Sequence, residues 1–126
     1  MYLHLMKSKI HRATVTGADL TYEGSISICP ELLRAAGLYR NERVDIYNCN
    51  NGARFTTYAI EGRAGEIVLN GAAARHVHKG DLVIIVAYAM VAPENAQAFE
   101  PNVVFVDAAN AIRDIRREAL PPLQAQ

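Results

Sequence analysis

Short segments in which apolar and polar residues alternate, separated by turn residues, make up most of this 126-residue chain. Such alternation is typical of strands that bury one face. The clearest case is "NNG" at residues 50–52, which predicts a hairpin between strands at 43–49 and 53–61. Further strands are expected at 2–16, 21–28, 66–70, 82–92 and 102–107, with a turn at 17–19. Many short strands with few helices favour a mainly β fold, a small closed barrel.

Helical signals are few. The segment "PELLRAAG" at residues 30–37 predicts a short helix, because proline suits the first turn and Gly37 suits the left-handed position that follows the last one. One or two helical turns are expected at 93–99, and residues 108–119 have helical spacing. We expect a mobile tail at 120–126.

Size and composition indicate one domain spanning residues 1–126. Thirteen basic residues balance thirteen acidic ones, which argues against nucleic acid or a membrane surface as partner. The longest apolar run, 82–92, is far shorter than the roughly 20 residues of a membrane span. The amino-terminal residues do not resemble a signal peptide, and Cys29 and Cys49 have no metal-binding or redox spacing. We therefore expect a cytoplasmic protein with reduced thiols.

One glycine interrupts an expected strand. In "TYEGSISI" the apolar positions Tyr22, Gly24, Ile26 and Ile28 share a face, and Glu23, Ser25 and Ser27 share the other. Glycine within a strand marks a bulge or a close backbone approach.

Cationic side chains recur at strand spacing. Lys7, Lys9 and His11 share one face of the first strand, and Arg54, Thr56 and Tyr58 share one face of another. Either set is an anion-binding wall or simply a solvated strand face, and the residues alone leave both interpretations open. Arginine suits a carboxylate, and a tyrosine phenol can donate a proton.

The segment "NGAAAR" at residues 70–75 combines small side chains with accessible backbone amides. It predicts either a backbone anion site or a tight turn packed by alanines. His76 and His78 lack a third ligand at a recognisable spacing, so a metal site is not favoured. From the residues alone we predict a small β-barrel that binds an anionic small molecule.

The motifs "YEGS", "NGARFTTYAI" and "NGAAAR", in this order, resemble the pyruvoyl-dependent aspartate 1-decarboxylases along nearly the whole chain. The resemblance implies a six-stranded double-psi β-barrel and a homotetramer with active sites near subunit interfaces. It also implies conversion of L-aspartate to β-alanine and CO2, for pantothenate and coenzyme A synthesis.

The resemblance further implies that the chain cuts itself between Gly24 and Ser25, giving chains 1–24 and 25–126. Ser25 becomes a pyruvoyl group, which forms a Schiff base with the amine of aspartate and accepts the electrons released as CO2 departs. Neither a metal nor pyridoxal phosphate is implied.

The family's residue roles carry over to matching positions. Tyr58 is implied as the proton donor, and Thr57 as a residue that assists cleavage at Gly24 and contacts substrate. The remaining implied roles are substrate binding by Lys9, Arg54, Gly71, Ala72 and Ala73, and support by His11, Tyr22 and Asn70. Thr57 and Tyr58 are adjacent, so both face one pocket only if the strand has a local bulge or the pocket lies at a strand end or subunit interface.

Two competing hypotheses stand beside the enzyme: a non-catalytic barrel of the DNA-binding regulator type, and a decarboxylase-like chain that never matures. Neutral net charge counts against the first. The second is open because a Gly-Ser pair is necessary for cleavage but not sufficient. The need for a separate maturation protein is also open.

Overall fold

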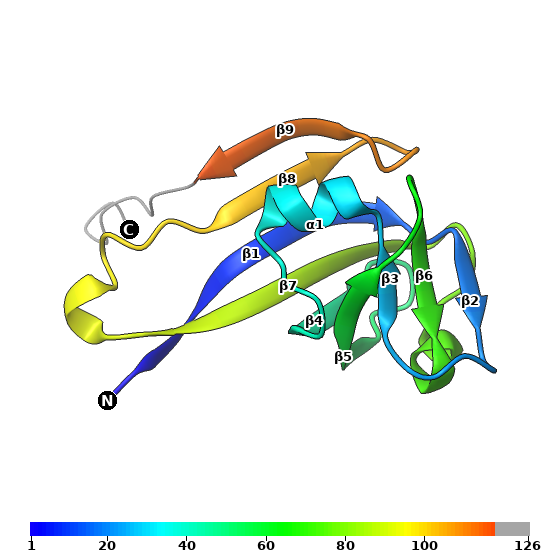
Figure 1. Ribbon diagram of the computed structural model, residues 1–126, viewed down its shortest axis with the longest axis horizontal. Helices are drawn as coiled ribbons and strands as arrows, with labels where there is room; N and C mark the ends of the chain where they lie inside the picture. The colour runs from blue at the N-terminus through cyan, green and yellow to red at the C-terminus, as the bar shows by residue number, and fades with distance from the viewer. Residues whose placement is uncertain (118–126) are drawn as a thin grey trace.

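Two long paired strands run through the sheet in this computed structural model, which describes residues 1–117. Strands β1 (Leu3–Thr14) and β7 (Leu82–Val91) pair antiparallel and extend together away from the other strands, toward the N-terminus (Figure 1). The remaining strands are β2 (Gly17–Asp19), β3 (Ile26–Ile28), β4 (Arg43–Asn48), β5 (Arg54–Glu61), β6 (Ile67–Asn70), β8 (Asn102–Val106) and β9 (Ile112–Arg117). The helical segments are α1 (Pro30–Ala36), η1 (Gly71–His76) and η2 (Pro93–Asn95).

Hydrogen-bonded neighbours within residues 1–117 follow the order β2-β6-β3-β5-β4-β7-β1-β8-β9. The mainly β class predicted from the sequence is confirmed. Closure into a six-stranded double-psi barrel stays a prediction. Within the same residues, no helix is long and apolar enough to cross a membrane.

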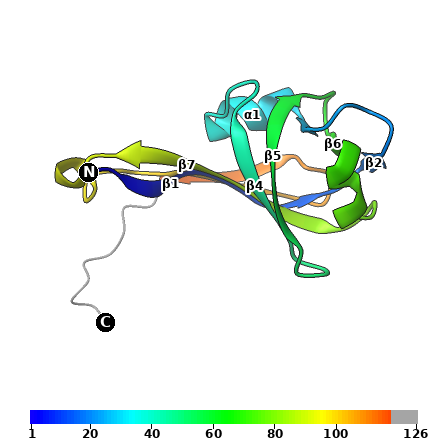
Figure 2. The ribbon, with the colours of Figure 1, turned by 90° about the horizontal axis from the view of Figure 1, so that it is seen from below.

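The predicted hairpin is present. Strands β4 and β5 pair antiparallel from Arg43 opposite Tyr58 to Tyr47 opposite Arg54, without a break in register. Figure 2 shows the hairpin projecting from the rest of the sheet, with its turn at the far end.

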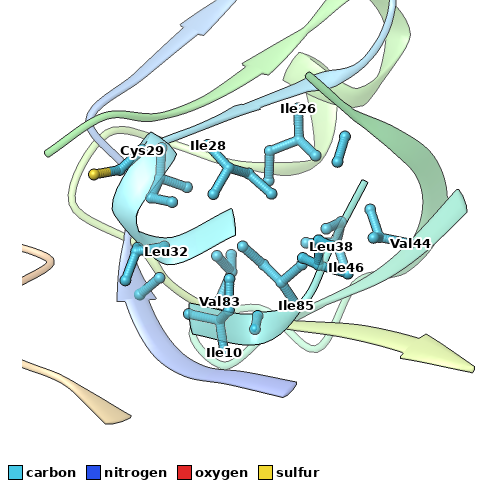
Figure 3. Close-up of a cluster of buried hydrophobic side chains, with 14 of the residues drawn as sticks. Ile10, Ile26, Ile28, Cys29, Leu32, Leu38, Val44, Ile46, Val83 and Ile85 are labelled. Carbon is cyan, nitrogen blue, oxygen red and sulfur yellow. The ribbon is translucent and has the colours of Figure 1, made fainter. Parts of the chain in front are cut away.

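The core lies on one face of the central strands. Ile10 of β1, Ile85 of β7 and Ile46 of β4 stand opposite one another, and each is fully buried. Helix α1 covers them with Leu32 and Leu33, and Ile26 and Ile28 of β3 close another side (Figure 3). Burial of apolar surface at about 25 cal/mol per Å² is the main force that holds these strands in register.

Helix α1 ends as predicted. Gly37 has φ 69°, and its N–H donates to the carbonyl of Arg34 in the left-handed cap that glycine adopts at low cost. The Ser8 hydroxyl of β1 donates to the carbonyl of Ala36, which ties the helix end to the sheet.

Two predictions near the amino terminus were wrong, a turn and a strand. Residues 17–19 form β2 instead of a turn, because they pair in parallel with residues 68–70 of β6. Residues 21–28 are a strand only from Ile26. The preceding residues form a turn in which Asp19 accepts hydrogen bonds from the N–H and hydroxyl of Thr21.

The helix predicted at 108–119 is wrong over the described residues, since 112–117 form strand β9, antiparallel to β8. Asp107 Oδ1 accepts hydrogen bonds from the N–H groups of Ala109 and Ala111. Asn110 adopts a left-handed φ of 63°. This turn reverses the chain onto β8, and pairing outweighs local helical spacing. Residues 118 and 119, and the predicted tail at 120–126, lie outside the described residues.

Candidate functional site

The Gly24-Ser25 bond lies at the entrance to β3, in an unusual backbone conformation. Gly24 has φ 26° and Ser25 has φ 93°. A non-glycine residue at such an angle is strained, at a cost of about 1–3 kcal/mol. Only 1% of Ser25 is exposed, so its hydroxyl is shielded from bulk water.

Asn70, at the end of β6, holds Ser25 from two sides. Its backbone N–H donates to the Ser25 carbonyl at 2.9 Å, and its Nδ2 donates to Ser25 Oγ at 3.1 Å. The same Nδ2 donates to Ser27 Oγ at 3.0 Å. Asn70 is itself 3% exposed, so these bonds form where water does not compete.

Gly71 allows β6 to approach the Gly24-Ser25 bond. A Cβ at position 71 would stand 2.7 Å from the nitrogen of Gly24 and 3.1 Å from the carbonyl oxygen of Tyr22. Gly71 also has φ 64°. Both facts require glycine here, and they place the start of η1 directly against the bond. Tyr22 contributes its backbone to this contact, while its side chain is exposed.

Tyr58 of β5 lies beside Gly24. A Cβ built on Gly24 would stand 3.5 Å from the Tyr58 hydroxyl oxygen. Because β5 has a regular register with β4, the strand has no bulge here, and Thr57 points to the opposite face. Among the described residues no hydrogen bond joins Thr57 to Gly24 or Ser25. The side chains of Thr57 and Tyr58 therefore do not converge within one chain.

Arg54 stacks on an aromatic residue of the neighbouring strand. Its guanidinium carbon lies 3.9 Å from the ring centre of Tyr47. The hydroxyls of Tyr47 and Tyr88 lie 3.2 Å apart, and this hydrogen bond raises the pKa of Tyr47 to about 12. Stacking leaves the guanidinium edge, with its N–H donors, available to a carboxylate.

The two lysines of β1 have different surroundings. Lys7 forms an ion pair with Glu42 at 2.6 Å and lies over the ring of Tyr39. Lys9 is partly buried and forms no ion pair within residues 1–117. Strands β4 and β7 stand between β1 and β5 in the strand order, so Lys9 is not on a strand that pairs with the strand of Tyr58. Arg54 is four residues along β5 from Tyr58, about 13 Å away.

His11 lines a different hollow. This cavity of about 350 Å³ is formed by His11, Arg12, Thr14, Leu82, Phe105, Val106, Asp107, Ala108 and Arg113. The His11 ring packs edge-on against Phe105, and its buried Nδ1 has no hydrogen-bond partner among residues 1–117. Burial, reinforced by the positive charges of Lys9 and Arg12, lowers the pKa of His11.

The predicted residues thus do not form a single cluster within one chain. The cleavage group, defined as Gly24, Ser25, Tyr58, Asn70 and Gly71, is gathered around one peptide bond. The cationic pair, Lys9 and Arg54, lies away from it, and His11 lines its own cavity. Ala72 and Ala73 follow Gly71 in η1, Ala72 exposed and Ala73 partly buried.

Sequence reasoning gave no role to Ser27. Strand alternation places it on the same face as Ser25, two residues further along. Its hydrogen bond to Asn70 could not be predicted, because it depends on how β3 and β6 pair.

As for metals, no group of three or more His, Cys, Asp or Glu side chains within residues 1–117 is arranged to hold an ion. His76 instead stacks on Phe55, with ring centres 4.8 Å apart. Cys29 and Cys49 are free thiols.

The aspartate decarboxylase family model matches residues 1–113, so this chain belongs to that family. An aspartate 1-decarboxylase of Bdellovibrio bacteriovorus is 64% identical over 118 residues, which cover 94% of this chain and 95% of the relative. The enzyme of the same name from Acetivibrio thermocellus is 54% identical over 120 residues, with 94% and 95% covered. That of a Hydrogenobaculum species is 54% identical over 118 residues, covering 94% of each chain.

Proposed function

We propose that this chain is an aspartate 1-decarboxylase that makes its own pyruvoyl group by cutting the bond between Gly24 and Ser25. The observation that carries the proposal is the environment of that bond. A strained, buried serine is held by Asn70 through both its carbonyl and its hydroxyl, next to the phenol of Tyr58. Membership of the aspartate decarboxylase family supports the reaction and the substrate, L-aspartate.

Cleavage begins at the Ser25 hydroxyl. Ser25 Oγ bonds to the carbonyl carbon of Gly24, the hydroxyl proton passes to the Ser25 nitrogen, and the C–N bond breaks, which leaves an ester and a free amine. Loss of the Cα proton then breaks the Cβ–Oγ bond and releases chain 1–24 with a carboxylate on Gly24. Water then hydrolyses the remaining enamine, whose nitrogen leaves as ammonia, and residue 25 becomes a pyruvoyl group.

The local structure favours the first step. Glycine gives the attacked carbonyl an unhindered approach, and breaking the bond relieves the positive φ of Ser25. Asn70 Nδ2–H stabilises negative charge on Oγ, both while this oxygen attacks and when it leaves as part of the carboxylate. The hydrogen bond from the Asn70 N–H keeps residue 25 in place after the chain has been cut.

The surroundings fit the small planar group that replaces serine. Asn70 offers a backbone and a side-chain donor at position 25, and Gly71 leaves no side chain in the space beside Gly24. The pyruvoyl ketone supplies an electron sink for decarboxylation of an amino acid. Tyr58, whose phenol stands beside Gly24, donates the proton that replaces the departing carboxylate.

The residues that we assign to substrate binding do not lie together within one chain. Arg54 and Lys9 hold the carboxylates of aspartate, with Thr57 and the backbone of residues 71–73 as further contacts, and His11 and Tyr22 line the pocket. Their separation within one chain supports a homotetramer in which a neighbouring subunit completes each site. We place the enzyme in the cytoplasm.

Purified protein incubated with L-aspartate tests this proposal, with β-alanine and CO2 as the products measured. Wild type should produce both, and Ser25→Ala neither. Tyr58→Phe should still be cut but turn over about a hundredfold more slowly or worse, because a general acid contributes that much. Equal turnover in Tyr58→Phe would remove Tyr58 from the proton-donor role, and absence of β-alanine from cleaved wild type would overturn the activity.

A further inference from the structure

Ser27 shares the side-chain amide that holds Ser25. Asn70 Nδ2 lies 3.1 Å from Ser25 Oγ and 3.0 Å from Ser27 Oγ. Because the amide carries two N–H groups, it has one for each hydroxyl. These contacts form a Ser25-Asn70-Ser27 triad on one face of β3 and β6. Nothing in the decarboxylation as described above requires Ser27.

The triad follows from strand alternation. Ile26 and Ile28 point into the core and are fully buried, so Ser25 and Ser27 point to the opposite face. Ile26 is paired with Leu69, and the Asn70 N–H extends that ladder to the carbonyl of Ser25. The register therefore fixes the Asn70 side chain between the two hydroxyls.

An asparagine amide with one partner is poorly oriented. Its terminal torsion is broad, so a single hydrogen bond leaves the amide free to rotate. A second partner on the other N–H restricts that rotation. Ser27 is partly buried, and its hydroxyl is such a partner next to the fully enclosed Ser25.

We propose that Ser27 is a positioning residue for self-cleavage: its hydroxyl holds the Asn70 amide so that the other N–H reaches Ser25 Oγ. The inference rests on the proposed function, because it concerns the same cut. During the attack the Ser25 proton passes to the Ser25 nitrogen as Oγ bonds to the Gly24 carbon and the C–N bond breaks. Both Asn70 N–H groups and the Ser27 hydroxyl keep their protons and act only by orientation and charge stabilisation.

The test follows cleavage of the full-length chain after cell-free synthesis, quenched in denaturant at intervals and weighed by mass spectrometry. Ser27→Ala should be cut about tenfold more slowly than wild type, the effect of losing one orienting hydrogen bond. Ser27→Thr keeps a hydroxyl at the same position and should restore most of the rate. An equally slow Ser27→Thr chain would contradict a role for the hydroxyl.

Ser8→Ala is the matched control. It removes another buried serine hydroxyl bond, to the carbonyl of Ala36, away from the cleavage group. Ser8→Ala should be cut at the wild-type rate, even if it is less stable. A slowing equal to that of Ser27→Ala would mean that both changes act through general loss of stability, against the proposal.

A double-mutant cycle tests whether Ser27 acts through Asn70. Asn70→Ala should slow the cut, and the double variant with Ser27→Ala should be no slower than Asn70→Ala alone. Multiplied effects would show that Ser27 acts independently and would overturn the inference. If wild type is cut and Ser27→Ala is cut at the same rate, the inference fails and the proposed function stands. If the isolated wild-type chain stays intact, the inference fails and so does self-cleavage without a second protein.

Discussion

At the scale of single residues, Gly71 is the glycine at which an added Cβ would make the closest contact. Gly71→Ala would place a Cβ 2.7 Å from the Gly24 nitrogen, at a φ of 64°. The left-handed angle costs about 1–2 kcal/mol, and overpacking adds about 1–3 kcal/mol. We expect the free energy of unfolding, measured in urea, to fall by about 2–5 kcal/mol and self-cleavage to be impaired.

Gly52→Ala is the control for this prediction. Gly52 also has a left-handed φ, 77°, but a Cβ there would meet nothing within 4 Å. Its cost should be about 1–2 kcal/mol, from the backbone angle alone. Equal losses for the two variants would contradict the close approach of Gly71 to Gly24.

His11 should make stability depend on pH. Burial and the charges of Lys9 and Arg12 lower its pKa below the ordinary 6.5, and the nearby Asp107 and Arg113 line the same cavity. Below pH 6.5 the unfolded chain takes up a proton at His11 before the folded chain does, so the free energy of unfolding falls as pH falls through this window. Well above pH 6.5 both states are neutral at this residue and the contribution is constant.

His11→Gln should therefore flatten the pH dependence of stability below about pH 6.5. Urea unfolding at a series of pH values measures this slope for both proteins. Identical slopes would mean that His11 is not held neutral by the fold.

At the scale of elements, Asn110 ties together three segments that are distant in sequence. Its Nδ2 donates to the carbonyls of Thr14, at the end of β1, and Gly65, between β5 and β6, and its Oδ1 accepts from the Thr14 N–H. Asn110 is 3% exposed. Asn110→Ala should lower the free energy of unfolding by about 2–4 kcal/mol, since it leaves buried partners unpaired.

Asn41→Ala separates the hydrogen bonds from the backbone angle. Asn41 has a similar φ, 70°, but is exposed, and within residues 1–117 its side chain makes no hydrogen bond. Its substitution should cost only about 1 kcal/mol, from the backbone conformation. A cost matching that of Asn110→Ala would argue against the three-way connection.

Elements with strong local signals were predictable from the sequence, and those decided by distant pairing were not. The hairpin at 50–52 and the helix ended by Gly37 depend on residues within a few positions of each other. Strand β9 depends on β8, although Ile112 and Ile115 suit one face of a helix. Tertiary pairing overrides local propensity here, and the turn at Asp107 and Asn110 makes that pairing possible.

At the scale of the whole molecule, sequence motifs predicted which residues belong to the candidate site. They did not predict how those residues are arranged. Resemblance named Ser25, Tyr58 and Asn70, which the fold brings around one bond. It also named Arg54, which lies four residues along β5 from Tyr58, and Lys9, whose strand β1 does not pair with β5. Spacing along one chain could not show that Ser27 meets Asn70 across β3 and β6, because that contact depends on how the two strands pair.

The separated cationic pair makes the assembly testable. Light scattering coupled to size-exclusion chromatography should give the mass of a homotetramer for the cleaved protein. A monomer with full decarboxylase activity would contradict completion of the site by a second subunit.

Denaturing mass spectrometry of the purified protein tests self-cleavage most directly. Wild type should give two chains, residues 1–24 and 25–126, and the longer should be lighter by one ammonia than the same chain with a free amino-terminal serine. Ser25→Ala should give one intact chain. A wild-type chain that stays whole after prolonged incubation, with its Gly24-Ser25 bond unbroken, would contradict self-cleavage of the isolated protein.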